Sequence, residues 1–441
     1  MAAVLGTPFS RASLTRLLAC LGVIASCRAL QRNPGAKAGW VAWTGGALVL
    51  AGGSAWMSHA AARLENRGVL LGLDALHQGA AAVWVGGLVH LFATARSEQR
   101  AWPRVALRRF SALALVAVAI LAAAGLGLSL FYVDGVRALL GTAYGGMLLA
   151  KGVLLVGLLT LGGLNFVAVH DRPPGTPALP PRLRRFVEVE VGLGITALFT
   201  AASLTSLPPA VDVVADRATL GEVATRFTPQ WPTLTSPSID ELPITDPLAP
   251  RTAEDIAWSE YNHHWAGLFV LAMGLLALLE RTGRARGARH WPLLFLGLAG
   301  FLFVRNDPGA WPLGPMGFWE SMAVSSVIQH RVFVLLTVAF GVFEWLVRTG
   351  QLRSPRWALV FPLLSAVGGA FLLAHSHALL DLKAEFLAEV THLPLGLLGI
   401  FVGWTRWLEL RLSPPANRGL GSSWRLGLVL VGTLLLLYRE R

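Results

Sequence analysis

The sequence has few charged residues and almost no cysteine. Lys, Arg, Asp and Glu make up 14% of the 441 residues, whereas 54% are hydrophobic, and the mean hydropathy is +0.58. A water-soluble domain could not cover so much apolar surface without aggregating, so the composition indicates a membrane protein. The two cysteines, Cys20 and Cys27, lie in one apolar run and are interpreted as packing residues rather than a disulfide or a thiolate site.

The sequence also lacks the motifs of the common soluble enzymes. It has no loop that resembles a nucleotide-binding motif, so ATP-driven pumping by this chain is not expected. No constellation of Ser, His and Asp suggests hydrolysis either. Enzymatic activity, as an oxidoreductase, is expected only if the chain binds haem.

Long apolar runs dominate the chain instead. A transmembrane helix needs about 20 mostly apolar residues. About twelve such runs occur, at 12–30, 38–58, 68–93, 109–133, 142–168, 186–206, 260–279, 289–305, 325–347, 357–376, 386–407 and 423–438. They lack the alternation of a membrane β-barrel, so the predicted fold is all-α, a polytopic transmembrane helix bundle. The first run is either a span or a signal-anchor.

Basic residues recur in every second loop, and short loops rich in Lys and Arg stay on the cytoplasmic side. These loops lie within residues 96–109, 172–185, 281–289, 348–356 and 406–418. The net charge of +12 is therefore explained by topology and contact with membrane lipids, and no nucleic-acid partner is predicted. The expected location is the bacterial inner membrane.

One long polar segment divides the spans into two blocks. Residues 207–258 are rich in Pro, Thr and acidic residues, which predicts an extracytoplasmic linker with at most a short strand or hairpin from Thr219 to Phe227. We therefore expect a transmembrane block at 1–206 and a second, His-rich transmembrane block at 259–441.

Histidine is distributed unevenly across the predicted membrane. Eight of the eleven histidines fall on or near the outer side, which favours a metal or haem site over independent interfacial residues: His59, His77, His263, His264, His330, His375, His377 and His392.

In the first block, His77 lies within a predicted span one turn after Asp74. The carboxylate could accept a hydrogen bond from one ring nitrogen and leave the other for a metal. His59 is expected at the same depth with Met57 nearby, and imidazole and thioether suit copper. The alternative is that His77 only hydrogen-bonds a neighbouring helix.

Three further ionisable residues lie within the spans of this block. Lys151 is in the middle of the fifth span, where it either pairs with Asp74 or forms a structural ion pair. Glu188 and Glu190 lie near the cytoplasmic start of the sixth span and are interpreted first as structural.

The second block offers imidazoles from four predicted helices, which is enough for a multi-histidine metal site or for bis-histidine haem b. Adjacent residues on a helix point about 100° apart, so His263 and His264 cannot easily face one centre. The candidate ligands are His263, His264, His330, His375, His377 and His392, with Glu260 and Glu389 as supporting residues.

Five strings in order carry a family resemblance: "WMSHA", "LDALHQGAAAVWVGGLVHL", "RRFSALALVAVAILAAAGL", "YGGMLLAKGVLLVGLLTLGGLN" and "VEVEVGLGITALFTAASLTSLPPA". In order and spacing, residues of about 40–210 resemble the copper-resistance D family, the CopD/PcoD type of bacterial inner-membrane protein. The resemblance implies copper transport and copper resistance, often beside a periplasmic copper chaperone of the CopC type. The second block is not matched, so haem-b electron transfer stays open as the alternative.

Overall fold

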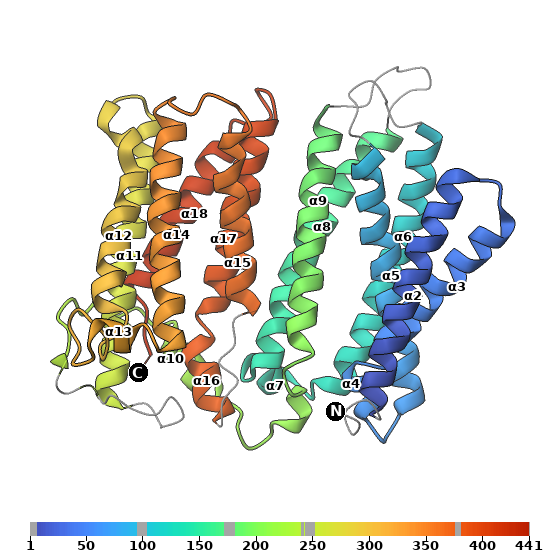
Figure 1. Ribbon diagram of the computed structural model, residues 1–441, viewed down its shortest axis with the longest axis horizontal. Coiled ribbons are helices and arrows are strands. Elements are labelled where there is room, and N and C mark those ends of the chain that lie inside the picture. The colour runs from blue at the N-terminus through green and yellow to red at the C-terminus, as the bar shows by residue number, and fades with distance from the viewer. Residues whose placement is uncertain are drawn as a thin grey trace. The chain divides into compact units, whose positions relative to one another are not determined.

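The computed structural model describes residues 7–94, 104–171, 181–239, 242, 252–374 and 381–440. Within these ranges the regular elements are helices, so the predicted all-α fold is confirmed (Figure 1). Ten of the described helices are long and apolar enough to cross a membrane. The predicted runs at 38–58 and 423–438 are helical too, in segments of 19 and 17 residues, so the number of crossings stays a prediction.

The chain divides into two compact units. The first comprises residues 1–135 and 155–213. Its elements are α2 (Pro8–Arg32), α3 (Lys37–Ala55), α4 (His59–Ala62), α5 (Arg67–Thr94), α6 (Arg104–Tyr132), the later part of α8 (Ala143–His170), α9 (Pro181–Leu204) and η1 (Ala210–Asp212). In the apolar 18-residue stretch of α9, 56% of the residues are buried, which is the largest share among the candidate spans.

Small residues let the helices of this unit approach each other. Phe110 of α6 packs over Gly87 of α5, where a Cβ would meet the ring at 2.2 Å. Gly125 of α6 similarly makes room for His77 of α5, since a Cβ there would lie 2.9 Å from the imidazole. Packing against glycine therefore fixes the rotation of α5 and the position of its histidine.

The second unit comprises residues 136–154 and 214–441. Its elements are α7 (Val136–Leu140), the start of α8, α10 (Leu220–Arg226), α11 (Ala253–Arg281), η3 (Arg286–Leu293), α12 (Leu294–Arg305), α13 (Phe318–Ser321), α14 (Ser325–Arg348), η4 (Trp357–Leu359), α15 (Val360–Ala374), α16 (Leu382–Glu389), α17 (His392–Arg411) and α18 (Leu420–Leu436). The short helices α10, α13 and α16 lie at the same end of this unit as the C-terminus (Figure 1).

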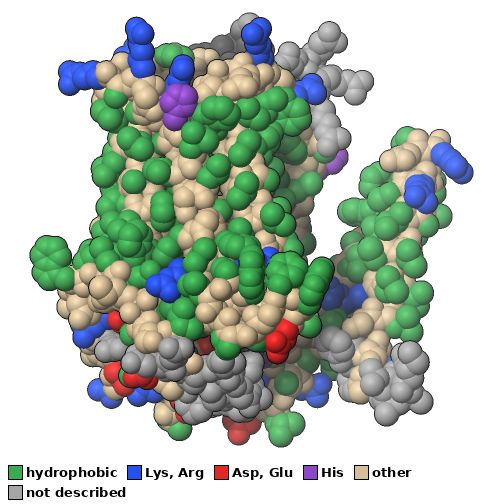
Figure 2. Space-filling view, turned by 60° about the vertical axis from the view of Figure 1, so that its left-hand side comes forward, with side chains coloured by type: hydrophobic (Ala, Val, Ile, Leu, Met, Phe, Trp, Pro, Cys, Tyr) green, Lys and Arg blue, Asp and Glu red, His purple; other side chains and the backbone are tan. Residues whose placement is uncertain are grey.

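The surface of this unit has the polarity expected of a membrane bundle. In Figure 2, Lys and Arg side chains rim its upper end, hydrophobic side chains cover its sides, and the visible Asp and Glu side chains lie toward its lower end. The basic end corresponds to the loops that the arginine pattern assigns to the cytoplasm. The end of the unit where His263 of α11 lies beside Tyr438, two residues after α18, is the opposite, outer end under that assignment.

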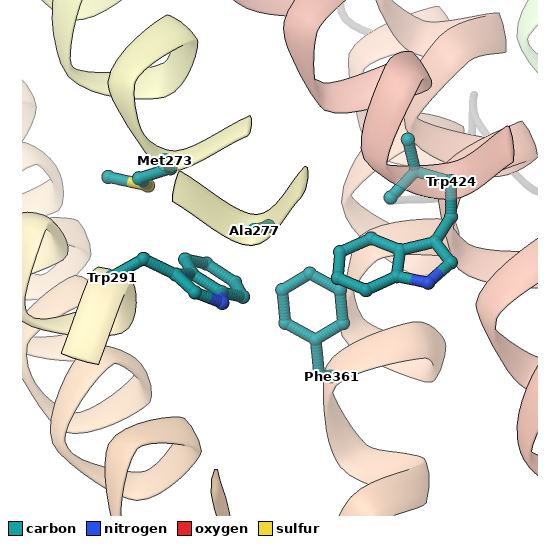
Figure 3. Packing of buried hydrophobic residues seen from close by; sticks show 6 residues of the cluster. Met273, Ala277, Trp291, Phe361 and Trp424 are labelled. Atoms are coloured by element: carbon teal, nitrogen blue, oxygen red, sulfur yellow. The ribbon is translucent and has the colours of Figure 1, made fainter. Parts of the chain in front are cut away.

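An aromatic cluster forms the core of the second unit. Trp291, Phe361 and Trp424 meet near Met273 and Ala277, and each of the five is at most 2% exposed (Figure 3). An ion-pair network lies beside this cluster. Arg348 bonds Glu280 of α11 and Glu344 of its own helix, both at 2.7 Å.

The predicted strand or hairpin from Thr219 to Phe227 is wrong, because the segment forms helix α10. Thr219 caps the helix by accepting a hydrogen bond from Glu222 N, and the Glu222 carboxylate accepts from Thr219 N. A Thr followed three residues later by Glu is the sequence signature of this capping box, and the high share of Pro and Thr around it obscured the signal.

Candidate metal centres

An aromatic and polar cluster lies at the end of the second unit that the arginine pattern predicts to face outward. The ring of His263, on α11, stacks on Tyr438 with centroids 3.9 Å apart and planes 16° apart. The ring of His392, the first residue of α17, lies 5.8 Å from that of His263. Two of the predicted ligands from different helices thus meet beside a buried tyrosine.

The hydrogen bonds of His263 define its tautomer. Its Nδ1 lies 2.8 Å from the backbone oxygen of Ser259, one turn earlier in α11. A carbonyl oxygen can only accept, so Nδ1 carries a hydrogen, and in the neutral ring Nε2 then carries the lone pair. This is the arrangement found in metal-binding histidines, where one ring nitrogen donates to an oxygen and the other faces the ion.

Two carboxylates lie in the same region. Glu260 Oε1 accepts a hydrogen bond of 2.9 Å from the backbone N–H of Glu440. The Tyr438 hydroxyl lies 3.2 Å from Glu440 Oε2 and 3.2 Å from the Ala388 carbonyl oxygen. Glu260 and Glu440 are 9% and 5% exposed. The cluster therefore combines imidazole nitrogen with buried carboxylate oxygens. Imidazole ligands suit copper and zinc ions.

His264 points to a different place. Thr233 N donates to its Nδ1 at 2.9 Å, and its Nε2 lies 2.9 Å from the Tyr438 carbonyl oxygen. Both ring nitrogens are thus occupied by backbone groups, and the residue is only 3% exposed. The structure gives His264 a packing role between α11, the segment at 233 and the C-terminal residues.

The remaining candidates of this block are separate or outside the described residues. His330 Nδ1 lies 2.7 Å from Asp307 Oδ1. Glu389 ends α16, three residues before His392. His375 and His377 lie outside the described residues.

In the first unit, His59 begins α4 and approaches the end of α9. Its Nε2 lies 3.4 Å from the Leu204 carbonyl oxygen, and its ring is 6.2 Å from that of Tyr132. Arg63 lies over the Tyr132 ring, at 5.7 Å, and pairs with Asp212 at 2.7 Å. His59 is therefore part of a polar corner formed by α4, α6 and the residues after α9.

His77 bonds a neighbouring helix. Its Nδ1 lies 2.9 Å from the Leu121 carbonyl oxygen of α6, and the Asp74 carboxylate accepts from the Gln78 amide at 2.8 Å. The backbone carbonyl again assigns a hydrogen to Nδ1, so in the neutral ring the lone pair is on Nε2. Met57 Sδ lies 3.0 Å from Arg16 Nη1. Lys151 lies in the part of α8 that belongs to the second unit.

Among the described residues, no three His, Cys, Asp or Glu side chains lie close enough together to hold a metal ion. The structure brings His263 and His392 together as a pair. Sequence reasoning missed Tyr438, the last residue of the final apolar run, and Glu440, which follows it. Their only sequence signal is a Tyr and a Glu at the junction of that run with the charged residues after it.

Two comparisons with known proteins found similar sequences. The family model described as copper resistance protein D matches residues 104–204. The copper transport protein CutJ of Bacillus subtilis (strain 168) is 35% identical over 190 residues, a stretch that covers 41% of this chain and 33% of that relative. No solved structure matches.

The matched segment coincides with well-defined elements. It begins at the first residue of α6 and ends at the last residue of α9, so it contains the long helices α6, α8 and α9 and the short helix α7. The comparisons and the ten apolar helices identify the chain as a multi-pass membrane protein. As the sequence motifs predicted, the segment 104–204 is similar to the copper resistance protein D family.

Proposed function

We propose that this protein transports copper across a bacterial inner membrane and contributes to copper resistance. The observation that carries the proposal is the match of α6, α8 and α9 to the copper resistance protein D family, together with the similarity to a copper transport protein. A bundle of apolar helices supplies the low-dielectric surroundings in which buried polar side chains bind an ion selectively. Both comparisons favour a transporter over an enzyme.

We further propose that copper is captured at the outer ends of both units. In the first unit the candidate ligands are His59 and His77, with the Met57 thioether as a softer ligand. In the second unit they are His263 and His392. In His77 and His263, a backbone carbonyl holds Nδ1 and orients the ring so that Nε2 carries the lone pair.

Of three other predicted ligands, this proposal leaves out one and keeps two. His264 is left out because backbone groups occupy both of its ring nitrogens. His375 and His377 are kept as candidates on the sequence alone. The haem-b alternative receives no support from the comparisons. An absorption spectrum of the purified protein without a Soret band would agree with this.

The test is metal binding by the purified protein and by single-residue variants. We expect His263→Ala and His392→Ala each to lower bound copper at the second unit roughly tenfold or more, since orienting partners of metal ligands alone change affinity by 10–100-fold. His90→Ala is the matched control, because His90 is exposed and lies near the cytoplasmic end of α5. Equal copper binding by all three variants would remove the pair from the proposed site.

The outer position of both candidate sites fits delivery of copper from outside the cytoplasm. A periplasmic chaperone of the CopC type is the partner that the family resemblance suggests. Copper transfer from such a chaperone to the protein should then fail in the His59→Ala variant, while the amount of copper bound nonspecifically to the membrane is unchanged. Transfer at the rate of the unaltered protein would contradict this route.

A further inference from the structure

A carboxyl group is buried within the most buried span of the first unit. Glu190 of α9 is 2% exposed. It follows the first residue of the helix by nine positions, which is about 14 Å along the axis at 1.5 Å per residue. The carboxyl group therefore lies within the apolar part of the helix bundle, beyond the polar start of α9.

Two residues of α8 form the surroundings of this carboxyl group. The Asn165 amide Nδ2 donates to Glu190 Oε2 at 2.7 Å. Glycine at 162 leaves room for the other oxygen, because a Cβ there would lie 3.1 Å from Glu190 Oε1. One oxygen thus has a neutral amide partner and the other lies against a helix backbone.

No cation balances Glu190 among the described residues, since Asn165 provides its hydrogen bond and no ion pair to it occurs there. On its own helix, Arg184 and Arg185 pair with Glu188 at 3.8 and 2.6 Å. The ionisable side chains of the packed helices α5 and α8 and of α9 itself are Arg67, Asp74, His77, His90, Tyr144, Lys151, His170, Arg182, Arg184, Arg185 and Glu188. None of them bonds to Glu190.

An isolated carboxylate in a low-dielectric interior is costly, so such a group is stable mainly as the neutral acid. Lys151, the cation within α8, precedes Asn165 by fourteen residues and is about 21 Å away along the helix axis. The contrast with Glu188 is informative. Both residues are buried on α9, yet Glu188 has guanidinium partners and Glu190 has an amide.

Asn165 supplies a second, independent observation. Its Oδ1 is buried and has no hydrogen-bond partner among the described residues. An amide presents a donor and an acceptor from almost the same place, and a half-turn of the side chain exchanges them. Nδ2 can therefore donate to the charged carboxylate, whereas Oδ1 can accept from the O–H of the protonated acid. Asn165 fits either protonation state of its partner.

We propose that Glu190 is a proton-binding site within the copper resistance D segment, and that Asn165 holds its carboxyl group in both protonation states. The proton binds a carboxylate oxygen of Glu190 and leaves from the same oxygen to water when the surroundings become hydrated. Where the chain transports copper, as proposed above, this site couples copper movement to proton movement. Only this coupling rests on the proposed function.

Infrared spectroscopy of the full-length protein in lipid, without copper, tests the site directly. The unaltered protein at neutral pH should show the carbonyl stretch of a protonated carboxylic acid, and E190Q should lose that component. N165A should shift the same band, since it removes the hydrogen-bond partner. E188Q is the matched control and should leave the band in place. A band of equal intensity in E190Q and the unaltered protein would overturn the proposal.

Two further measurements complete the test. Should E190Q fail to accumulate, E190D keeps an acid in a shorter side chain, and an unchanged band in E190D would equally overturn the proposal. In vesicles that take up copper, E190Q should lose the dependence of uptake on a pH gradient, whereas E188Q should keep it. If no variant takes up copper but the band behaves as described, the transport proposal fails and the proton site stands.

Discussion

His263 and Tyr438 lie face to face in the second unit, with ring centroids 3.9 Å apart. The first belongs to α11, and the second follows α18 near the end of the chain. Tyr438 also lies 6.3 Å from His392, so one aromatic ring contacts both histidines of the pair. The C-terminal residues therefore help to fix the distance between the two proposed ligands.

Replacing Tyr438 should loosen this arrangement in graded steps. Tyr438→Phe keeps the stacked ring and loses the hydroxyl contacts, so a loss of about 1 kcal/mol in the free energy of unfolding is expected. Tyr438→Ala also removes the buried ring and should cost about 3 kcal/mol. Thermal unfolding in detergent measures both. Equal stability of the two variants would show that the ring does not order the cluster.

His264 should behave as a structural residue despite its position next to His263. His264→Ala leaves the Thr233 N–H and the Tyr438 carbonyl without their imidazole partner, at a cost of about 1–3 kcal/mol in unfolding free energy. Copper stoichiometry should stay the same in the protein that remains folded. Loss of copper at full stability would instead place His264 among the ligands.

The contact between α10 and α16 should weaken at low pH. Lys383 and Thr219 donate hydrogen bonds to Glu222 and lower the pKa of its carboxyl group from 4.5 to about 2. A depressed pKa stabilises the folded form above pH 4.5, and this contribution is lost as the pH falls from 4.5 toward 2. Proteolysis near α10 as a function of pH measures the effect. Glu222→Gln should abolish the pH dependence in this window.

Close packing of α11 on α18 should make Gly432 intolerant of a side chain. A Cβ at this position would lie 2.2 Å from Leu271 N, a backbone atom that cannot rotate away. Gly432→Ala should therefore destabilise the protein by about 1–3 kcal/mol. Gly300→Ala in α12 is the control, because no atom lies within 4 Å of its Cβ position. It should be neutral or slightly stabilising.

The ion pairs of Arg348 should be essential for the second unit. Its guanidinium bridges α11 and α14 and lies 4.6 Å from the Trp291 ring centroid. Arg348→Ala leaves Glu280 and Glu344 without this cation in a buried setting, which should cost about 3–5 kcal/mol. Arg353→Ala, at an exposed position, should have little effect. Comparable stability of both variants in a denaturant titration would contradict this role.

The sequence alone was sufficient to predict the helical membrane fold and the family that residues 104–204 resemble. Hydropathy and loop charge act on each segment separately, so apolar runs such as 109–133 and 142–168 could be assigned as spans without knowing their neighbours. The strings around His59, His77 and Lys151 could likewise be compared with a family without knowing which helices contact each other. The helix α10 was missed, although its capping box from Thr219 to Glu222 was legible.

Only the tertiary structure decided which polar residues act together. The sequence offered His263 and His264 as equal candidates, and the packing of α11 turned one toward His392 and the other toward backbone groups. From the sequence, Glu190 was interpreted as a structural charge near the start of a helix. The fold instead buries it against Asn165. The partner of a side chain depends on helix rotation and on which helices touch, and those are set by contacts between residues far apart in the chain.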